Sequence, residues 1–253
     1  MEALTARRVR ADNHAASVPR TVTYLGAAAF VIAAAWFWLA VKGVTVTAAP
    51  RTAPGVGPQQ ALRIYYRWQV TTLPQERYYT TVAIAGFGCL AVAAAFLRDL
   101  AGLDRRLARI GALAVAAGAL LWVTGRVLVL GGHRAVGLMA THTNPIQTTN
   151  SIAFTIDTTG AAFALTAFAL VGAGMFAFAT AARHPGHRAW ALSTAVIAVA
   201  MVGTAASYAG GNGDLSDVML LISGAVLLPG WLIWTGRLGP ADPASADPLT
   251  EQP

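Results

Sequence analysis

The sequence predicts an all-α, polytopic membrane protein: a bundle of six transmembrane helices with a short amphipathic helix at the outer membrane interface. Three observations support this fold class. Hydrophobic residues make up 56% of the 253 positions and charged residues only 11%, whereas soluble domains carry about 25% charged residues. The mean hydropathy is +0.55. Several apolar runs also reach the roughly 20 residues needed to cross a hydrocarbon core.

Six apolar runs predict the transmembrane helices, and together they occupy a membrane domain at 21–237. The flanking segments, 1–20 and 238–253, are polar and poor in core-forming residues, so we expect disordered cytoplasmic tails there. The predicted spans, in chain order, are 22–41, 78–97, 110–130, 152–181, 189–208 and 215–235.

The helix of the fourth span is expected to begin before its apolar part. Asn144, Pro145 and Gln147 form an N-cap, a first-turn proline and a capping-box partner. A helix from there to Ala181 would have about 37 residues and a length of about 55 Å, which exceeds a hydrocarbon core of about 30 Å. Two or three turns therefore project from the membrane, or the helix breaks near Gly160.

A further helical segment precedes the second span. Pro58 and Pro74 bracket residues 59–73, and proline is tolerated at a helix start but not inside a helix. Apolar and aromatic side chains surround a narrow basic stripe, which favours a helix at headgroup depth. It would rest on the bundle as a cap or act as a lid over a binding cavity. Its characteristic residues are Arg63, Tyr65, Tyr66, Arg67 and Trp68.

Basic residues predict the orientation. Placing both termini in the cytoplasm puts eleven Lys and Arg residues inside and six outside, and cytoplasmic loops are the ones enriched in these residues. Lys42 is the only lysine among 18 basic residues, and with the abundance of alanine this bias indicates a GC-rich bacterial genome and a plasma-membrane location. The net charge of +7 follows from topology, so we expect no nucleic-acid partner.

Two charged residues lie inside apolar runs near the predicted outer face. Arg126 stands about five residues before the outer end of the third span, and Asp157 stands among threonines in the fourth. A charge within a membrane helix costs at least about 2.5 kcal/mol, so such residues usually face the bundle and find partners. We expect Arg126 and Asp157 to pair, and to line an outer polar pocket with Asn150 and Thr158. The pair either pins the two spans together or receives an anion, a cation or a proton.

Other chemistry-bearing residues give weaker expectations. His133 and His142 bracket the outer loop after the third span, and a metal ion there would need ligands converging within about 2.0–2.2 Å. Asp214 and Asp217 fit the capped start of the sixth span, with a cation site as the alternative. Lone Cys89 excludes a disulfide framework within one chain, and hydrolase and phosphate-loop motifs are absent. We predict no cofactor.

The sequence therefore favours a non-enzymatic membrane protein: a small transporter or ligand binder, or an accessory subunit, with a polar pocket around Arg126 and Asp157. The lipid bilayer is its expected environment, and a partner would be another membrane protein or a second copy of the chain. Two alternatives remain. One is a metal-dependent or redox membrane enzyme that uses the outer-loop histidines, and the other is a purely structural membrane partner.

Overall fold

The computed structural model describes residues 18–47, 50, 54–100, 102–141, 145–211 and 213–238. Within these ranges the regular elements are helices, and six of them are long and apolar enough to cross a membrane. The predicted all-α, six-span architecture is confirmed. Most of each predicted tail, at 1–20 and 238–253, lies outside the described residues.

The helices follow one another through short connections. In chain order they are α2 (Arg20–Val41), α3 (Pro58–Leu97), α4 (Arg105–Thr141), α5 (Ile146–Ala181), the 3-10 turn η1 (Pro185–His187), α6 (Arg188–Ala209), α7 (Gly213–Ile222), the π-helical turn η2 (Ser223–Leu227) and α8 (Leu228–Thr235). The last three elements together form the sixth span, Asp214–Thr235.

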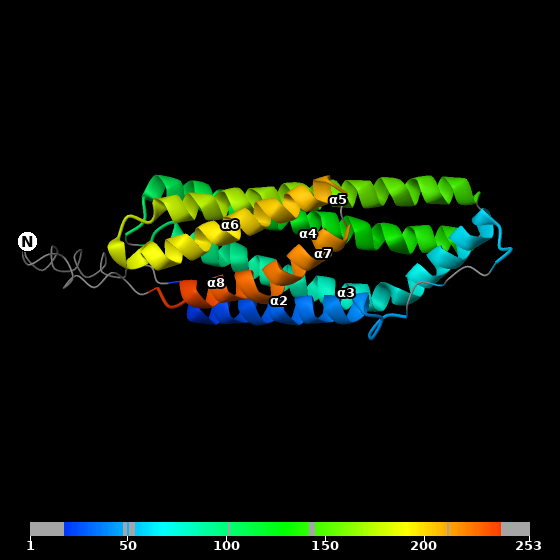
Figure 1. Cartoon of the computed structure of the whole chain (residues 1–253), viewed down its shortest axis with the longest axis horizontal. Helices are drawn as coiled ribbons and strands as arrows, with labels where there is room; N and C mark the ends of the chain where they lie inside the picture. The colour runs from blue at the N-terminus through cyan, green and yellow to red at the C-terminus, as the bar shows by residue number, and fades with distance from the viewer. Residues whose placement is uncertain are drawn as a thin grey trace, which may run out of the picture.

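The six spans are arranged as a closed ring. Each span packs against its neighbours in the sequence, and the sixth span packs back against α2. Arg20 Nε donates to the carbonyl of Gly236 at 3.3 Å, so both ends of the described chain meet at one end of the bundle. We call this the terminal end, and it lies at the left in Figure 1. The opposite end, where α4 ends and α5 begins, is the extended end.

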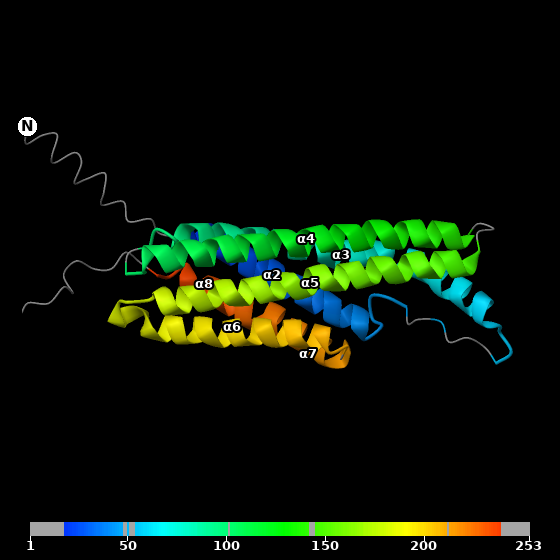
Figure 2. The same ribbon diagram turned by 90° about the horizontal axis from the view of Figure 1, so that it is seen from above.

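Three helices are much longer than the others. α3, α4 and α5 have 40, 37 and 36 residues, whereas α2 and α6 have 22 each. A helix of 36 residues is about 54 Å long and one of 22 residues about 33 Å. The long helices therefore project beyond the others at the extended end, as Figures 1 and 2 show. α5 continues through Gly160 without a break, so it projects, the first of the two outcomes expected from its sequence.

Residues 59–73 form the first part of α3 and not a separate helix. Pro74 lies inside α3, where a proline removes one backbone hydrogen bond and bends the helix without necessarily ending it. The cyan start of α3 is visibly inclined to the rest in Figure 1. Tyr66 packs with Val136 and Ile146 in a small core within the projection. These contacts hold the segment against α4 and α5, which corrects the expectation of an independent interfacial helix.

The α4–α5 contact is built from small residues at a seven-residue spacing. A Cβ at Gly118 would lie 2.7 Å from the carbonyl oxygen of Ala167, and one at Gly111 would lie 3.0 Å from that of Gly174. Small residues let two helix backbones approach closely, and a seven-residue repeat keeps them on one face of a left-handed pair. The repeat on α4 comprises Gly111, Gly118, Gly125 and Gly132.

The sixth span contains the π-helical turn η2. The N–H of Leu228 donates to the carbonyl of Ser223, five residues earlier. Pro229 follows directly, and proline has no N–H and collides with the carbonyl four residues before it in a regular α-helix. The wider turn therefore relieves the helix just before the proline. Single π turns within helices are frequent at functional sites.

The loops at the terminal end are joined by Asp104. Its N–H donates to the carbonyl of Ala181 at 2.7 Å, and its carboxylate accepts from the N–H groups of Arg106 and Leu107, each at 3.0 Å. The carboxylate also forms an ion pair with Arg183. These contacts hold the pKa of the Asp104 carboxyl below its ordinary value, first through the Leu107 N–H and also through the nearby guanidinium.

Candidate functional site

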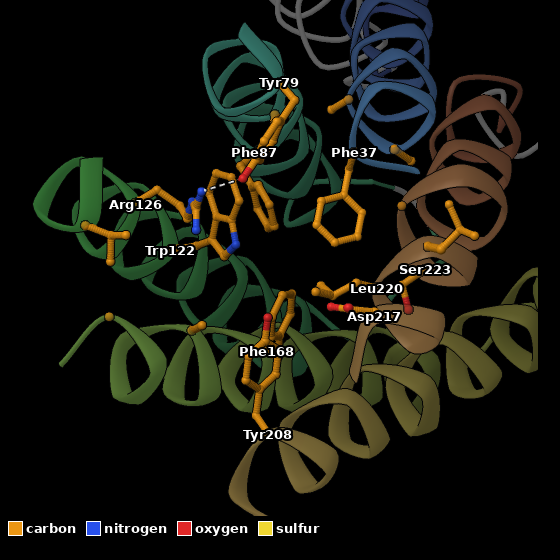
Figure 3. Close-up of a pocket in the computed structure, with 18 of the residues that line it drawn as sticks. Phe37, Tyr79, Phe87, Trp122, Arg126, Phe168, Tyr208, Asp217, Leu220 and Ser223 are labelled. Atoms are coloured by element: carbon orange, nitrogen blue, oxygen red, sulfur yellow. Dashed lines mark hydrogen bonds between the residues drawn. The ribbon is translucent and has the colours of Figure 1, made fainter. Parts of the chain in front are cut away.

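The ring of six spans surrounds a cavity of about 330 Å³. On α4 its lining extends from Trp122 to His133, and on α5 from Asp157 to Phe168. Each interval is 11 residues, or about 16 Å along the helix axis, which is about half of a hydrocarbon core. Figure 3 shows side chains from several helices facing this space. The aromatic part of the lining consists of Phe30, Phe37, Tyr79, Phe87, Trp122, Phe168 and Tyr208.

The cavity is polar toward the extended end and apolar toward the terminal end. Asp157 and Asp217, near the extended end, are exposed. Phe30, Phe168 and Leu228, which form the floor, are only 3%, 3% and 2% exposed. Water or a ligand arriving from the extended end therefore meets the charged groups first.

Arg126 points from α4 toward α3. Its Nη2 lies 3.0 Å from Glu76 Oε1, 3.0 Å from Tyr79 Oη and 3.3 Å from Thr80 Oγ1, and it can donate to these oxygens. The guanidinium carbon also lies 5.6 Å from the centroid of the Tyr79 ring, within the range of a cation–π contact. Glu76 and Arg126 have side chains only 16% and 24% exposed. Arg126 therefore has a carboxylate counter-ion inside the ring.

His133 continues this arrangement two turns further along α4. Its Nδ1 lies 3.4 Å from Glu76 Oε2, and its Nε2 lies 2.8 Å from Asp157 Oδ1. A carboxylate only accepts hydrogen bonds, so both contacts are hydrogen bonds when both ring nitrogens carry hydrogen. We call Arg126, Glu76, His133 and Asp157 the polar chain. It connects α3, α4 and α5 along one side of the cavity.

The predicted Arg126–Asp157 pair does not form. Arg126 pairs with Glu76 and Asp157 with His133, so the two residues are linked only through these partners. Gly132 of α4 packs against Ile156, which places Asp157 level with His133. Arg126 is seven residues away on α4, or about 10 Å along the axis. The difference in height along the helices explains why each charge has another partner.

Glu76 is the site residue that the sequence analysis missed. The expected helix end at Pro74 assigned Glu76 to a loop, whereas α3 continues past the proline. Glu76, Tyr79 and Thr80 are spaced i, i+3 and i+4, so a continuous helix places all three on one face. That spacing, read together with the buried Arg126, was the available signal.

Asn150 and Thr158, expected in the pocket, do not line it. Asn150 Oδ1 accepts a hydrogen bond from Tyr66 Oη at 2.7 Å within the projection. Thr158 Oγ1 donates to the carbonyl of Phe154 at 2.7 Å on an exposed face of α5. Each residue along a helix turns the side chain by about 100°. Thr158 therefore faces outward although its neighbour Asp157 faces the cavity.

The residues expected in the interfacial helix connect the start of α3 to other segments. Arg63 Nη1 donates to the carbonyl of Ala140 at 3.3 Å, and Trp68 Nε1 donates to the carbonyl of Thr47 at 2.9 Å. The segment is therefore held to the end of α4 and to the chain after α2. The ring of Tyr65 packs against the rings of Tyr66 and Trp68, and Arg67 is exposed.

The histidines expected to bind a metal ion are not seen together. His133 contacts the carboxylates of the polar chain, and His142 lies outside the described residues. In the described ranges, no group of three or more His, Cys, Asp or Glu side chains is arranged to hold a metal ion. A metal site that uses His133 and His142 stays a prediction.

The sixth span contributes a different kind of polar group. Figure 3 shows Asp217 reaching from α7 into the cavity, opposite Arg126. Among the described residues, Asp217 has no hydrogen-bond or ion-pair partner. Ser223 lines the same side, is 2% exposed, and its Oγ has no hydrogen-bond partner in that part of the chain. This side of the cavity therefore presents two polar groups, Asp217 and Ser223, that have no hydrogen-bond partner among the described residues.

Comparisons with protein-family models, with curated proteins and with solved structures found no match. The function is accordingly inferred from the cavity and its charges. An aromatic space with ionisable groups at one end is suited to hold a small molecule that has an apolar body and a polar or charged group.

Proposed function

We propose that this protein is a small-molecule binder or transporter of the membrane that takes its ligand into the central cavity. The observation that carries the proposal is the cavity of about 330 Å³ with the polar chain on one of its sides. Ligand pockets commonly have volumes of about 300–1,000 Å³ and apolar linings with a few placed polar groups. Ionisable residues inside membrane spans are costly, and they usually mark such sites.

A purely structural role accounts less well for the polar chain. One ion pair would be enough to fix two spans, whereas four ionisable side chains from three helices gather beside the cavity. The α4–α5 contact is already defined by Gly111, Gly118, Gly125 and Gly132. An additional polar contact between α4 and α5 would therefore add little to the alignment that the glycines already set.

We further propose that the protein lies in a bacterial plasma membrane with both termini in the cytoplasm. The count of Lys and Arg in the sequence, eleven on the predicted cytoplasmic side against six outside, supports this orientation. The extended end then faces outward, and a ligand enters past Asp157 and Asp217. Binding requires no further change, whereas transport requires the apolar floor at Phe30 and Phe168 to part.

A pair of variants tests the proposal. Ala161 lines the cavity, so Ala161→Phe should fill part of it. Ala162 is exposed and is not among the lining residues, so Ala162→Phe adds the same ring outside the cavity. Both purified variants should be monodisperse and unfold cooperatively without ligand, which would show that the bundle is intact.

Three small probes are then added to each protein: phenyltrimethylammonium, its uncharged analogue tert-butylbenzene, and benzenesulfonate. A ligand that binds only the folded state raises the unfolding temperature. We expect at least one probe to raise it for the unmodified protein and for Ala162→Phe, but not for Ala161→Phe. The proposal is wrong if no probe raises it, or if Ala161→Phe responds as strongly as Ala162→Phe.

A further inference from the structure

We infer that the ligand of the cavity is an organic cation with an apolar body, and that Asp217 receives its charge. The inference rests on the proposed function, because it assigns a ligand class to the same cavity. It depends on the difference between the two charged sides of the cavity, on the aromatic side chains between them, and on the unsatisfied group at Ser223.

The side formed by the polar chain already contains its own counter-ions. Arg126 has Glu76 at 3.0 Å, and Asp157 has His133 at 2.8 Å. The hydrogen bonds of Arg126 all come from Nη2, and its Nε has no partner among the described residues. An anionic ligand that reached this Nε would still approach three carboxylates, those of Glu76, Asp157 and Asp217. This side therefore gives little attraction for an anion.

The opposite side presents a carboxylate without a counter-ion. Asp217 lines the cavity, and no described residue forms a hydrogen bond or ion pair with it. Asp214, one turn earlier on α7, adds a second negative charge nearby and does not line the cavity. A carboxylate beside apolar side chains is stabilised by a cation at contact distance. A ligand cation would supply this partner.

The side chains between the two charged sides are mainly aromatic. Phe87 stacks on Trp122 with ring centroids 4.4 Å apart, and Phe168 stacks on Tyr208 with centroids 6.1 Å apart. Figure 3 shows both pairs around the space that Asp217 enters. Aromatic faces attract organic cations that lie within about 6 Å of the ring centroid, and they also pack against an apolar body. This lining suits an organic cation better than a hydrated metal ion.

Ser223 gives an independent indication that a ligand completes this side. It lines the cavity, is 2% exposed, and its Oγ has no hydrogen-bond partner among the described residues. Buried hydroxyl groups in proteins are nearly always hydrogen-bonded. Ser223 lies six residues after Asp217, about 9 Å further along the span. The unsatisfied groups thus mark a stretch of α7 and η2 as the surface that a ligand contacts.

The test measures binding of radiolabelled phenyltrimethylammonium to the protein in lipid nanodiscs. We expect saturable binding that unlabelled phenyltrimethylammonium displaces, and that equal concentrations of tert-butylbenzene or benzenesulfonate do not. Asp217→Asn should weaken binding at least tenfold. Asp217→Glu, which keeps the charge, should restore most of the affinity. Asp214→Asn removes the same charge three residues away and should weaken binding much less than Asp217→Asn, because Asp214 does not line the cavity.

The outcomes separate this inference from the proposed function. The inference is wrong if Asp217→Asn binds the cation as tightly as the unmodified protein, or if Asp214→Asn weakens binding equally. It is also wrong if tert-butylbenzene or benzenesulfonate binds better than the cation. If Ala161→Phe abolishes the binding of that other probe, the cavity is still a ligand site and the proposed function stands. If none of the three probes binds, the proposed function fails as well.

Discussion

In the described part of the chain, ion pairs connect the helices at the polar chain and at the loop around Asp104, and the two sites differ in their surroundings. The Glu76–Arg126 pair lies inside the ring, with side chains 16% and 24% exposed. In the loop pair the Asp104 side chain is 20% exposed, but its partner Arg183 is 74% exposed. Water solvates the loop pair whether or not it is formed, so an exposed pair contributes little to stability. Inside the ring, a charge that loses its partner has less access to solvent, so the loss of the partner costs more. Breaking an ion pair should therefore destabilise the protein more inside the ring than at the loop.

The hydrogen bonds show the same difference. Asp104 mainly accepts from backbone N–H groups at the start of α4, so it serves as an N-cap that also pairs with Arg183. Among the described residues, the polar partners of the Glu76 carboxylate are the side chains of Arg126 and His133. The loop site organises local backbone, whereas the polar chain organises side chains beside a cavity. The four predictions that follow test this contrast, from the largest expected effect to the smallest.

Removing one member of the inner pair should have the largest effect. Glu76→Met leaves the Arg126 guanidinium inside the ring without its carboxylate, and we expect a loss of about 3–5 kcal/mol in the free energy of unfolding. Adding Arg126→Met should recover most of this loss, because that charge is then gone. The measurement is equilibrium unfolding in mild detergent with increasing SDS. A double variant no more stable than Glu76→Met would show that the pairing is not the cause.

His133→Phe should have the next largest effect. It removes the contacts of both ring nitrogens with Glu76 and Asp157 while keeping a ring of similar size, and hydrogen bonds to charged groups contribute about 1.5–3 kcal/mol. The same SDS titration measures the loss. Asp157→Asn is the companion variant, because its amide oxygen can still accept from His133 Nε2. Asp157→Asn should therefore destabilise less than His133→Phe, and the reverse order would contradict the proposed role of His133.

A packing change between α4 and α5 alters no charge. The loss in free energy of unfolding should be similar to that of His133→Phe or smaller. In Gly118→Ala the new Cβ would lie 2.7 Å from the carbonyl oxygen of Ala167, and forcing extra atoms into a packed contact costs about 1–3 kcal/mol. At Gly131 a Cβ meets no atom within 4 Å. Gly131→Ala should stabilise α4 by up to about 1 kcal/mol. Equal unfolding curves for the two variants would refute the close helix contact.

The loop pair should give the smallest effect, and it should depend on pH. The pKa of Asp104 is lowered in the folded protein, mainly by the Leu107 N–H and also by Arg183. Its contribution is therefore present above the ordinary carboxyl pKa and is lost as the pH falls through the lowered value. We expect the difference in unfolding temperature between the unmodified protein and Asp104→Asn to be small at neutral pH. The difference should disappear in acid, and one that grows in acid would contradict this assignment.

The sequence predicts the membrane architecture well, because the bilayer imposes a simple length and composition on each span. The six spans and the projection of α5 follow from apolar runs and from the helical rise. The full lengths of α3 and α4 do not follow in this way. Their polar parts pack against each other beyond the apolar runs, as Tyr66 does with Val136, and such packing leaves no hydropathy signal.

The candidate site was only partly predictable. Arg126 and Asp157 stand out because their neighbours in the sequence are apolar, and both do line the cavity. The residues with which they pair depend on the relative height and rotation of three helices. A shift of one residue along a helix changes the height by about 1.5 Å and the direction of the side chain by about 100°. Glu76 was obscured by Pro74, and Asp217 by its plausible role near a helix start. The glycine repeat on α4 is visible in the sequence as a glycine at every seventh position from 111 to 132.

The glycine repeat on α4 also limits how the protein can move. Its four members cover residues 111–132, about 32 Å of close contact with α5. If α4 slid along α5 by less than a full repeat, about 10 Å, bulky side chains such as Val171 or Phe163 would lose their places against these glycines and collide with the opposite backbone. The α4–α5 hairpin therefore moves as one rod. Any widening or narrowing of the cavity must come from α2, α3, α6 and the sixth span.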